Sequence, residues 1–406
     1  MAVQRYRVDD ACVCGRYCFV VRPLRIALIG GPQYDQVQVV LDAFTASTGV
    51  IVEVGFRGEH VTLNKHVATD LLQGSSYDLI STHSKYAPSQ APWLQSLDEL
   101  VSIDDLAGVH EGALKLCRVD GALMSVPRNV DARLLFINRE LIDDQWAPSS
   151  WTQLLESLCG LADQTGVPGF AFPSRDSGLF GTFYELTAAC GGHLFDQGGQ
   201  PQFSSDAARE ALLLMVDACR LRRIVPTGMV ESAWHYDEVS AAFREGRVAV
   251  VGDWPGYFAL LTAQSEVRDR VRFRLSRYPL GVDGARHVYA GCHAWAIPSA
   301  AADKTASLAL LAHLTSRDAG VADAAAGMVP VRQDVSMPSE DSLDLERAEL
   351  LRLTVATDLL TFPPMPQYPA IEDAAAVNLR SALLGELSIT DALAAAQRAA
   401  RIALAV

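Results

Sequence analysis

Polar and aromatic side chains follow the predicted strands of this chain at the points where the strands end. Ligands of open α/β sheets bind beyond the carboxyl ends of strands, so we expect these side chains to meet at one site. Each residue taken singly also fits a core or surface role. Together they predict a binding site. The residues are Thr82, His83, Ser84, Tyr86, Asp131, Arg133, Trp254, Tyr257, Gly291, His293, Trp295 and Arg332.

The sequence contains none of the common motifs of catalytic or nucleotide-binding sites. It has no G-x-S-x-G elbow, no P-loop, no G-x-G-x-x-G turn after a strand and no H-E-x-x-H zinc motif. His60 and His66 are six residues apart, which does not place them on one helical face. Cys12, Cys14 and Cys18 lack the C-x2-C spacing of zinc sites. We therefore predict no catalytic residue, no metal site and no cofactor.

Alternating strands and helices must position the candidate residues. A short apolar strand over 25–30 precedes a helix with apolar residues at helical spacing, which ends at Gly49, and a second strand follows at 50–54. This βαβ unit predicts a parallel-rich sheet with helices on both faces. Ser150 and Gln153 fit the capping box of a later helix. Further strands are predicted at 77–81, 134–138, 247–254 and 294–298, and a closing helix at 388–403.

Size and charge limit the function classes. A chain of 406 residues predicts two or three domains, and a net charge of −14 argues against nucleic acid as a partner. No run of 18 uncharged apolar residues is present to span a bilayer. Five cysteines stand singly in apolar surroundings and are expected to be small buried side chains. They are Cys117, Cys159, Cys190, Cys219 and Cys292.

Several sequence blocks occur in a characteristic order. They include a T-G-x-x-V-x-V strand, a D-G…P…F-I-N segment, the run F-R-E-G-R-V-A-V-V-G-D-W and the turn G-M-V-P-V-R. In this order the chain resembles the family 1 extracellular solute-binding proteins, the carbohydrate receptors of ABC importers, from about Arg25 to the C-terminus. The blocks lie at 43–54, 77–83, 94–101, 120–142, 147–156, 190–212, 242–257, 289–298, 327–332 and 385–393.

The resemblance implies an α/β fold of the periplasmic-binding-protein type II kind. Two α/β lobes would be joined by a hinge of several strands, with the ligand cleft between them. The chain would cross between the lobes near Asp131, Gly291 and Val331. The implied division is an N-terminal extension of unclear role at 1–24, an N-lobe of 25–130 plus 292–330, and a C-lobe of 131–291 plus 331–406.

The resemblance also implies roles for the candidate residues. Trp254 would be the main flat platform for a sugar, with Tyr86 or Trp234 opposite it. Asp131 would accept hydrogen bonds from two hydroxyls, while Arg332 and His83 would donate. Basic residues near the expected cleft hint at a solute with an anionic group, although solvated surface charge also explains each of them. These basic residues are Lys85, Arg128, Arg133 and Arg332. The remaining residues expected to contact the ligand are Thr82, Gly291 and His293.

The family implies a monomeric receptor that binds a mono- or oligosaccharide, closes around it, delivers it unchanged to an ABC permease, and is periplasmic or attached to the cell surface. Residues 1–24 show no recognisable export signal, so a cytoplasmic sugar sensor of the same fold is one alternative. A glycoside hydrolase is another, because Asp131 with Glu59 or Glu185 could supply paired carboxylates.

Overall fold

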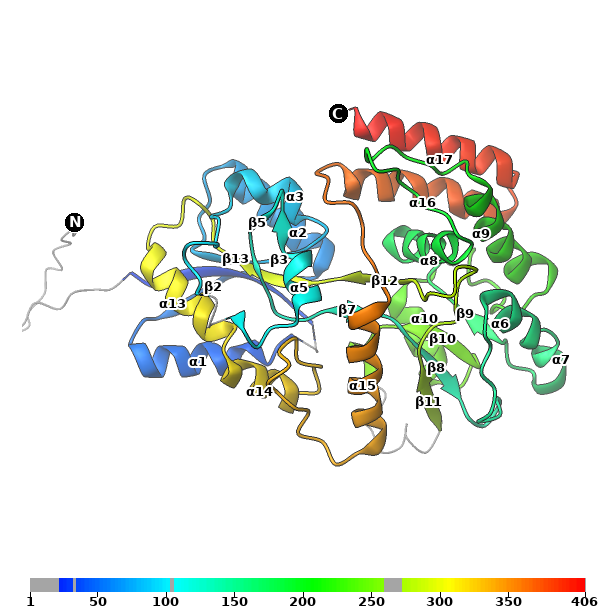
Figure 1. The fold of residues 1–406 in the computed structure, drawn as a ribbon, viewed down its shortest axis with the longest axis horizontal. Helices are drawn as coiled ribbons and strands as arrows, with labels where there is room; N and C mark the ends of the chain where they lie inside the picture. The colour runs from blue at the N-terminus through cyan, green and yellow to red at the C-terminus, as the bar shows by residue number, and fades with distance from the viewer. Residues whose placement is uncertain (1–21, 32–33, 103–105, 259–271, 406) are drawn as a thin grey trace, which may run out of the picture.

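The computed structural model describes residues 22–31, 34–102, 106–258 and 272–405. Two sheets lie in separate halves of the molecule, and a third, small sheet lies between the halves (Figure 1). This arrangement confirms the predicted α/β fold with two lobes. The expected extension with Cys12, Cys14 and Cys18 lies almost entirely outside the described residues.

The sheet of the N-terminal lobe has five strands in the order β2-β1-β3-β13-β6. β1 runs parallel to β2 and β3, whereas β13 pairs antiparallel with β3 and β6. β3 extends to His83, two residues beyond the predicted end, so Thr82 and His83 lie within the strand. The bounds are β1 (Leu24–Ile29), β2 (Val52–Gly58), β3 (Leu79–His83), β6 (Val126–Pro127) and β13 (His293–Ala296).

Helices cover both faces of this sheet because alternate side chains of β1 enter different cores. Leu24, Ile26 and Leu28 pack in one cluster with residues of α1 and α13. Ala27 and Ile29 pack in another with residues of α2. The helix α1 ends at a glycine with φ of 73°, as predicted. The helices are α1 (Val37–Thr48), α2 (His60–Leu72), α13 (Lys304–Leu314) and α14 (Arg317–Ala325).

The sheet of the C-terminal lobe has four strands in the order β11-β8-β10-β9. β8 is antiparallel to both of its neighbours, and β9 and β10 are parallel. The predicted parallel-rich sheet was based on the βαβ unit of the N-terminal lobe, where two of the four strand pairs are parallel and two are antiparallel. The apolar pattern of a buried strand does not encode the direction of its neighbour. The bounds are β8 (Leu134–Asn138), β9 (Phe170–Ala171), β10 (Val250–Asp253) and β11 (Phe273–Ser276).

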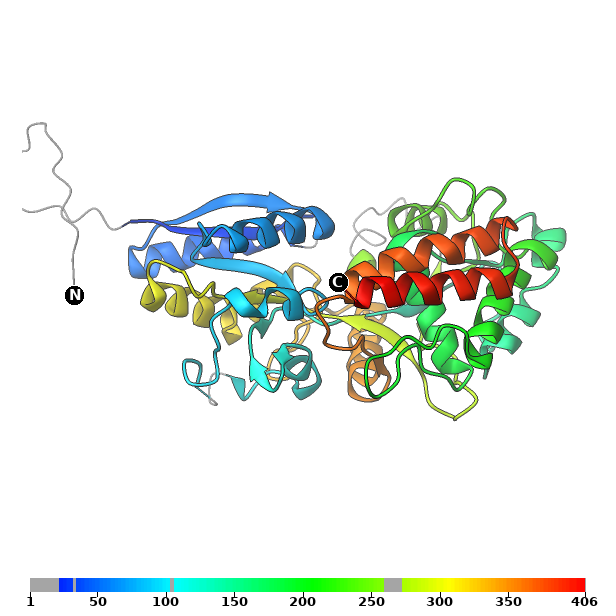
Figure 2. The same ribbon diagram turned by 90° about the horizontal axis from the view of Figure 1, so that it is seen from above.

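One large core joins this second sheet to its helices. Almost every residue of α8 is buried in that core, and the C-terminal helices α16 and α17 pack against each other along the same lobe (Figure 2). Their bounds are α8 (Asp176–Ala189), α9 (Asp206–Val216), α16 (Tyr368–Leu384) and α17 (Ile389–Leu404).

A small sheet in the order β14-β12-β7 connects the lobes (Figure 1). β7 leads into β8 of the C-terminal lobe, and β12 leads into β13 of the N-terminal lobe with one residue between them. β7 begins at Asp131 and β12 ends at Gly291, two of the three predicted crossing points. The bounds of the lobes themselves stay a prediction. The strands are β7 (Asp131–Ala132), β12 (Val288–Gly291) and β14 (Leu359–Leu360).

Further elements complete the described part of the chain. Among its helices, none is both long and apolar enough to cross a membrane. The elements are α3 (Ala87–Gln90), η1 (Ala91–Trp93), α5 (Glu111–Leu116), β4 (Arg118–Val119), β5 (Ala122–Leu123), α6 (Trp151–Ser157), α7 (Leu161–Thr165), η2 (Asp217–Leu221), α10 (Tyr236–Arg244), η3 (Pro255–Tyr257) and α15 (Ser342–Thr357).

Candidate functional site

Three histidines from separate elements meet at the edge of the N-terminal lobe. His60 begins α2, His83 ends β3 and His293 begins β13. Their ring centroids are 4.7 Å apart for His60 and His83, 4.9 Å for His83 and His293, and 5.3 Å for His60 and His293. We call His60, His83 and His293 the histidine cluster. The ring centroid of Tyr86 lies 5.4 Å from that of His60.

The histidine cluster is uncharged at neutral pH. Burial lowers the pKa of His60 and His83 well below their ordinary value, and it lowers the pKa of His293 to about 3. The Nδ1 atom of His83 accepts a hydrogen bond from the backbone N–H of Lys85 at 3.1 Å. Because a neutral imidazole carries one N–H, the proton of His83 lies on Nε2. His83 is therefore able to donate one hydrogen bond from Nε2.

Gly291 makes room for the imidazole of His83. A Cβ atom at position 291 would lie 2.3 Å from Nε2 and 2.5 Å from Cε1 of that ring. Such distances are far inside van der Waals contact, so a side chain here would displace the ring. The predicted residues Gly291, His83 and His293 thus meet at the end of β12.

Asp131 lies beside the histidine cluster at the start of β7. Its two carboxylate oxygens accept hydrogen bonds from Nδ2 of Asn129, each at 3.1 Å, and Oδ2 lies 4.0 Å from Nε2 of His293. Asn129 also accepts from the backbone N–H of His293 at 3.1 Å. Burial raises the pKa of Asp131 to about 7, against the opposing effect of the Asn129 hydrogen bonds. The carboxyl group can therefore act as acceptor and as donor near neutral pH.

Trp254 follows β10 in the C-terminal lobe and is half-buried. Its ring lies 5.3 Å from the ring of Tyr236, and the guanidinium carbon of Arg133 lies 5.5 Å from the indole. The backbone N–H of Trp254 donates to Oδ1 of Asp253 at 2.8 Å. The indole therefore packs between Tyr236 and Arg133, and the residue as a whole is half-buried.

Arg133 is buried and held by α8. Its Nε donates to Oε1 of Glu185 at 3.1 Å, its Nη2 lies 2.6 Å from Oε2 of the same residue, and its Nη1 donates to Thr182 at 3.1 Å. Burial disfavours the charged guanidinium, but Glu185 outweighs burial and raises the pKa of Arg133. The guanidinium thus lies beside the Trp254 ring with Glu185 and Thr182 as partners, and its predicted contact with a ligand stays a prediction.

Three other predicted residues are engaged elsewhere. Thr82 is buried and donates to Oε1 of Gln90 at 2.6 Å. Arg332 donates to both carboxylate oxygens of Asp334, at 2.9 and 2.7 Å, and to the carbonyl of Thr315 at 3.1 Å. Trp234 is half-buried, and its ring lies 5.7 Å from the guanidinium of Arg247.

The basic residues that hinted at an anionic ligand each have a carboxylate partner. Nζ of Lys85 lies 2.6 Å from Glu372, and Nη2 of Arg128 lies 3.1 Å from Asp323. The other two pairs are Arg133 with Glu185 and Arg332 with Asp334, at 2.6 and 2.7 Å. Each of these cations is therefore already compensated by a neighbouring carboxylate.

The pair of Lys85 and Glu372 joins the two lobes. Lys85 follows β3 of the N-terminal lobe, Glu372 lies on α16 of the C-terminal lobe, and the side chains are 6% and 1% exposed. Glu372 also accepts a hydrogen bond from the hydroxyl of Tyr289 at 2.9 Å. Burial opposes the charge on Lys85, but Glu372 outweighs burial and raises its pKa.

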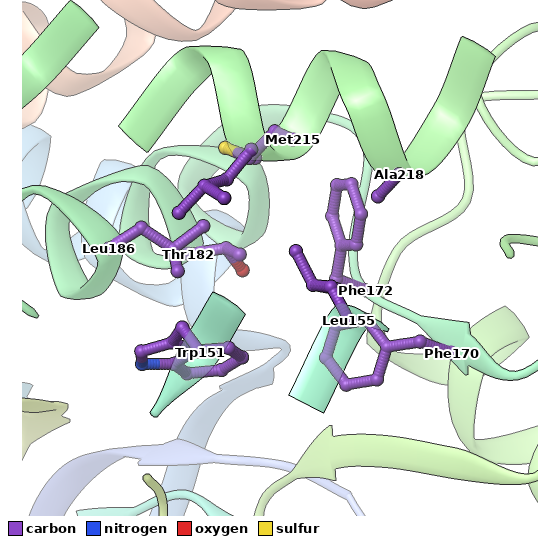
Figure 3. A pocket seen from close by; sticks show the side chains of 9 residues that line it. Trp151, Leu155, Phe170, Phe172, Thr182, Leu186, Met215 and Ala218 are labelled. Carbon is purple, nitrogen blue, oxygen red and sulfur yellow. The ribbon is translucent and has the colours of Figure 1, made fainter. Parts of the chain in front are cut away.

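A small apolar cavity lies elsewhere, inside the C-terminal lobe between α6, β9, α8 and α9 (Figure 3). None of the predicted site residues lines it. Within the described ranges, no group of three or more His, Cys, Asp or Glu side chains is arranged to hold a metal ion. The cavity is lined by Trp151, Leu155, Phe170, Phe172, Thr182, Leu186, Leu214, Met215 and Ala218.

Two α/β lobes joined by short crossing strands, with histidine, aromatic and acidic side chains at their junction, define a two-lobed solute-binding protein. The family model described as "Bacterial extracellular solute-binding protein" matches residues 40–345, and the chain belongs to this family.

Two binding proteins are similar to this chain in sequence, and a solved structure is similar in fold. The chain is 27% identical over 377 residues to a mannitol-binding protein of Pseudomonas aeruginosa, covering 84% of this chain and 83% of the relative. It is 25% identical over 257 residues to a probable amino-acid ABC transporter periplasmic-binding protein of Sinorhizobium fredii, covering 59% and 58%. The structure of T. maritima MalE3 with maltose bound has a TM-score of 0.83 at 22% identity and covers 94% of this chain and 99% of that one.

Proposed function

We propose that this protein is the solute-binding component of an ABC importer for a neutral sugar or polyol. The observation that carries the proposal is that basic side chains near the histidine cluster each lie beside a carboxylate, while burial lowers the pKa of the cluster histidines. Neutral donors and acceptors suit a ring or chain of hydroxyls. The similarity to a mannitol-binding protein supports the same class of ligand.

We assign the ligand contacts to residues of both lobes. The exposed part of the Trp254 indole covers the apolar C–H face of the solute. Nε2 of His83 donates to one hydroxyl, and Asp131 and His293 exchange hydrogen bonds with others. Tyr86 supplies the second aromatic surface, since it contacts the histidine cluster, whereas Trp234 contacts Arg247. The ligand lies in a cleft between the lobes, which close around it.

The remaining parts of the proposal follow the family. The protein acts as a monomer in the periplasm or at the cell surface, and an ABC permease recognises its closed form. The solute leaves chemically unchanged. The carboxylate of Glu185 supports this view, because Arg133 and the backbone N–H of Tyr289 already engage it, the latter at 2.8 Å. Such a carboxylate is poorly placed to act with Asp131 as a hydrolytic pair.

A thermal-unfolding screen tests the ligand class. The panel contains mannitol and other polyols, maltose and simple sugars, the matching sugar acids and amino acids. A true ligand at about 100 times its dissociation constant should raise the free energy of unfolding by about 2.7 kcal/mol. We expect neutral polyhydroxylated compounds to stabilise the protein and sugar acids and amino acids to leave it unchanged. Stabilisation by sugar acids alone would contradict a neutral ligand.

Product analysis tests the absence of chemistry. The stabilising compound is incubated with stoichiometric protein and recovered by chromatography. We expect the compound to return intact, because the proposed site offers hydrogen bonds and stacking and Glu185 is already engaged by Arg133 and Tyr289. Hydrolysed or rearranged product that increases with protein concentration would identify an enzyme instead.

A further inference from the structure

Two cysteines distant in sequence meet inside the N-terminal lobe. Cys117 follows the last residue of α5, and Cys292 is the single residue between β12 and β13. They are 175 residues apart in sequence, both are 0% exposed, and their sulfur atoms are 3.7 Å apart. Both side chains belong to the same apolar cluster. The sulfurs are in van der Waals contact, and a disulfide would bring them to a bond length of about 2.05 Å.

The backbones of both cysteines are fixed by hydrogen bonds. The N–H of Cys292 donates to Oγ of Ser84 at 3.0 Å, and its carbonyl accepts from the N–H of Ser84 at 2.9 Å. The carbonyl of Cys117 accepts from the N–H of Met124 at 3.1 Å. Because these backbones are held in place, the two sulfur atoms stay next to each other in the folded lobe.

We propose that Cys117 and Cys292 form a disulfide when the chain folds in an oxidising compartment. An oxidising compartment follows from the proposed location outside the cytoplasm, so this part of the inference rests on the proposed function. Formation of the disulfide itself requires no bound solute. The two thiols lose two protons and two electrons as the new S–S bond forms. The electron pair reduces the S–S bond of a disulfide oxidant to two thiols, through a mixed disulfide with the protein.

The bond forms before folding is complete. Thiol–disulfide exchange needs a thiolate, and burial together with the neighbouring Cys117 raises the pKa of the Cys292 thiol well above its ordinary value. In the folded protein, both sulfurs are also closed to a solvent-borne oxidant. The same burial then protects the finished bond from reduction.

The bond would anchor the end of the crossing strand β12 within the N-terminal lobe. Cys292 lies between Gly291 and His293, two residues of the candidate site, so the bond ties this part of the site to α5. Closing a loop of this length also removes much conformational freedom from the unfolded chain. The protein with the bond should therefore unfold at a higher temperature than the reduced protein.

Refolding followed by peptide mapping tests the proposal. The full chain is unfolded and reduced, then refolded with reduced and oxidised glutathione, quenched with N-ethylmaleimide and digested without reductant. We expect the peptide that contains Cys117 to be linked to the peptide that contains Cys292, with a mass two hydrogens below the sum of the two reduced peptides. The exposed Cys159 should be alkylated. Recovery of both buried cysteines as alkylated single peptides, or joined to any other cysteine, would overturn the proposal.

Thermal unfolding supplies a second readout on matched variants. A phosphine reductant applied during refolding should lower the unfolding temperature of wild type and of Cys159→Ser by several degrees. It should leave Cys117→Ala/Cys292→Ala unchanged. If the double variant does not fold, the peptide map of wild type still decides. No sugar enters either experiment, so their failure is independent of the proposed function.

Discussion

The partly exposed indole of Trp254 is the residue on which ligand affinity depends most directly. We expect Trp254→Ala to raise the dissociation constant of the solute found in the screen at least about tenfold, because the stacking surface and its apolar contact are lost. Trp254→Phe should retain most of the affinity, since it keeps a flat ring. Titration calorimetry measures both variants, and circular dichroism checks that each is folded. An Ala variant with wild-type affinity would show that another residue provides the platform.

Asp131 connects the site to pH. Its pKa is about 7 in the folded chain and about 3.8 when solvated, so between these values the folded state holds a proton that the unfolded state has released. This group alone therefore makes the free energy of unfolding fall by about 1.4 kcal/mol per pH unit as the pH rises from 4 to 7. The three cluster histidines act in the opposite direction, since their lowered pKa values remove stability as the pH falls below 6.5.

The variant Asp131→Asn isolates that contribution. The free energy of unfolding of the variant minus that of wild type should rise from pH 4 to pH 7 and level off above pH 7. The variant should also bind the solute more weakly than wild type. Urea unfolding at a series of pH values measures the first quantity and calorimetry the second. A pH-independent difference would mean that the Asp131 carboxyl has an ordinary pKa in the folded protein.

The sequence predicted the residues at strand ends better than those brought together by distant segments. The rule for strand ends predicted His83, Asp131, Gly291 and His293. In the structure His83 lies against Gly291 and His293, and His293 lies beside Asp131. Glu372 was missed, because it is 287 residues from its partner and no local signal marks it. His60 was considered only with His66, since a spacing rule within one helix says nothing about contacts with β3 and β13. Thr82 donates a hydrogen bond to Gln90 and Arg332 to Asp334, partners that position along the strands alone could not show.

At the scale of elements, helix ends and strands with a long apolar run were predictable, and short strands were not. α1 ends at its glycine because that residue adopts a left-handed conformation without strain. Ser150 accepts from the N–H of Gln153 at 3.2 Å, as a capping residue should. The two-residue strands β7 and β14 carry no periodicity, so only tertiary pairing with β12 reveals them.

The helix α8 stabilises the crossing strands through one buried carboxylate. Glu185 engages Arg133 next to β7 and the backbone N–H of Tyr289 on β12, so one side chain joins three elements. We expect Glu185→Gln to lower the free energy of unfolding by about 3–5 kcal/mol, because the buried guanidinium would lose its counter-charge. Urea unfolding measures the loss.

A surface ion pair provides the matched control for this prediction. Glu349 and Arg352 lie on α15, three residues apart, with side chains 55% and 56% exposed. Glu349→Gln removes the same kind of partner from an arginine that remains in water, so no measurable loss of stability is expected. Equal losses in the two variants would show that burial does not set the cost of breaking the Arg133 pair.

At the scale of the whole molecule, charge is distributed unevenly. The chain carries a net charge of −14, yet the basic groups at the junction of the lobes are each matched by a carboxylate. The acidic excess therefore lies on other parts of the chain, where it keeps the protein soluble and has little effect on a neutral solute. Contacts between the lobes thus depend on individual ion pairs. Among the residues that the structure describes, Lys85 and Glu372 form a deeply buried pair of this kind, with side chains 6% and 1% exposed.

This pair should favour the closed arrangement of the lobes even without solute. The double variant Lys85→Met/Glu372→Gln removes both charges, which avoids leaving one of them buried alone, and Gln keeps an acceptor for the Tyr289 hydroxyl. We expect the unliganded variant to have a larger radius of gyration by small-angle X-ray scattering and to bind solute several-fold more weakly, because binding must then supply more of the closing free energy.

Saturation with solute tests whether the pair of Lys85 and Glu372 acts only on closure of the lobes. If the pair acts only on closure, the scattering curves of wild type and double variant should coincide once both are saturated, since the ligand then holds the lobes together. Lys115→Met/Glu111→Gln removes an exposed pair within α5 and should behave as wild type throughout. A double variant of Lys85 and Glu372 that matches wild type in radius of gyration and affinity without ligand would show that other contacts hold the lobes together.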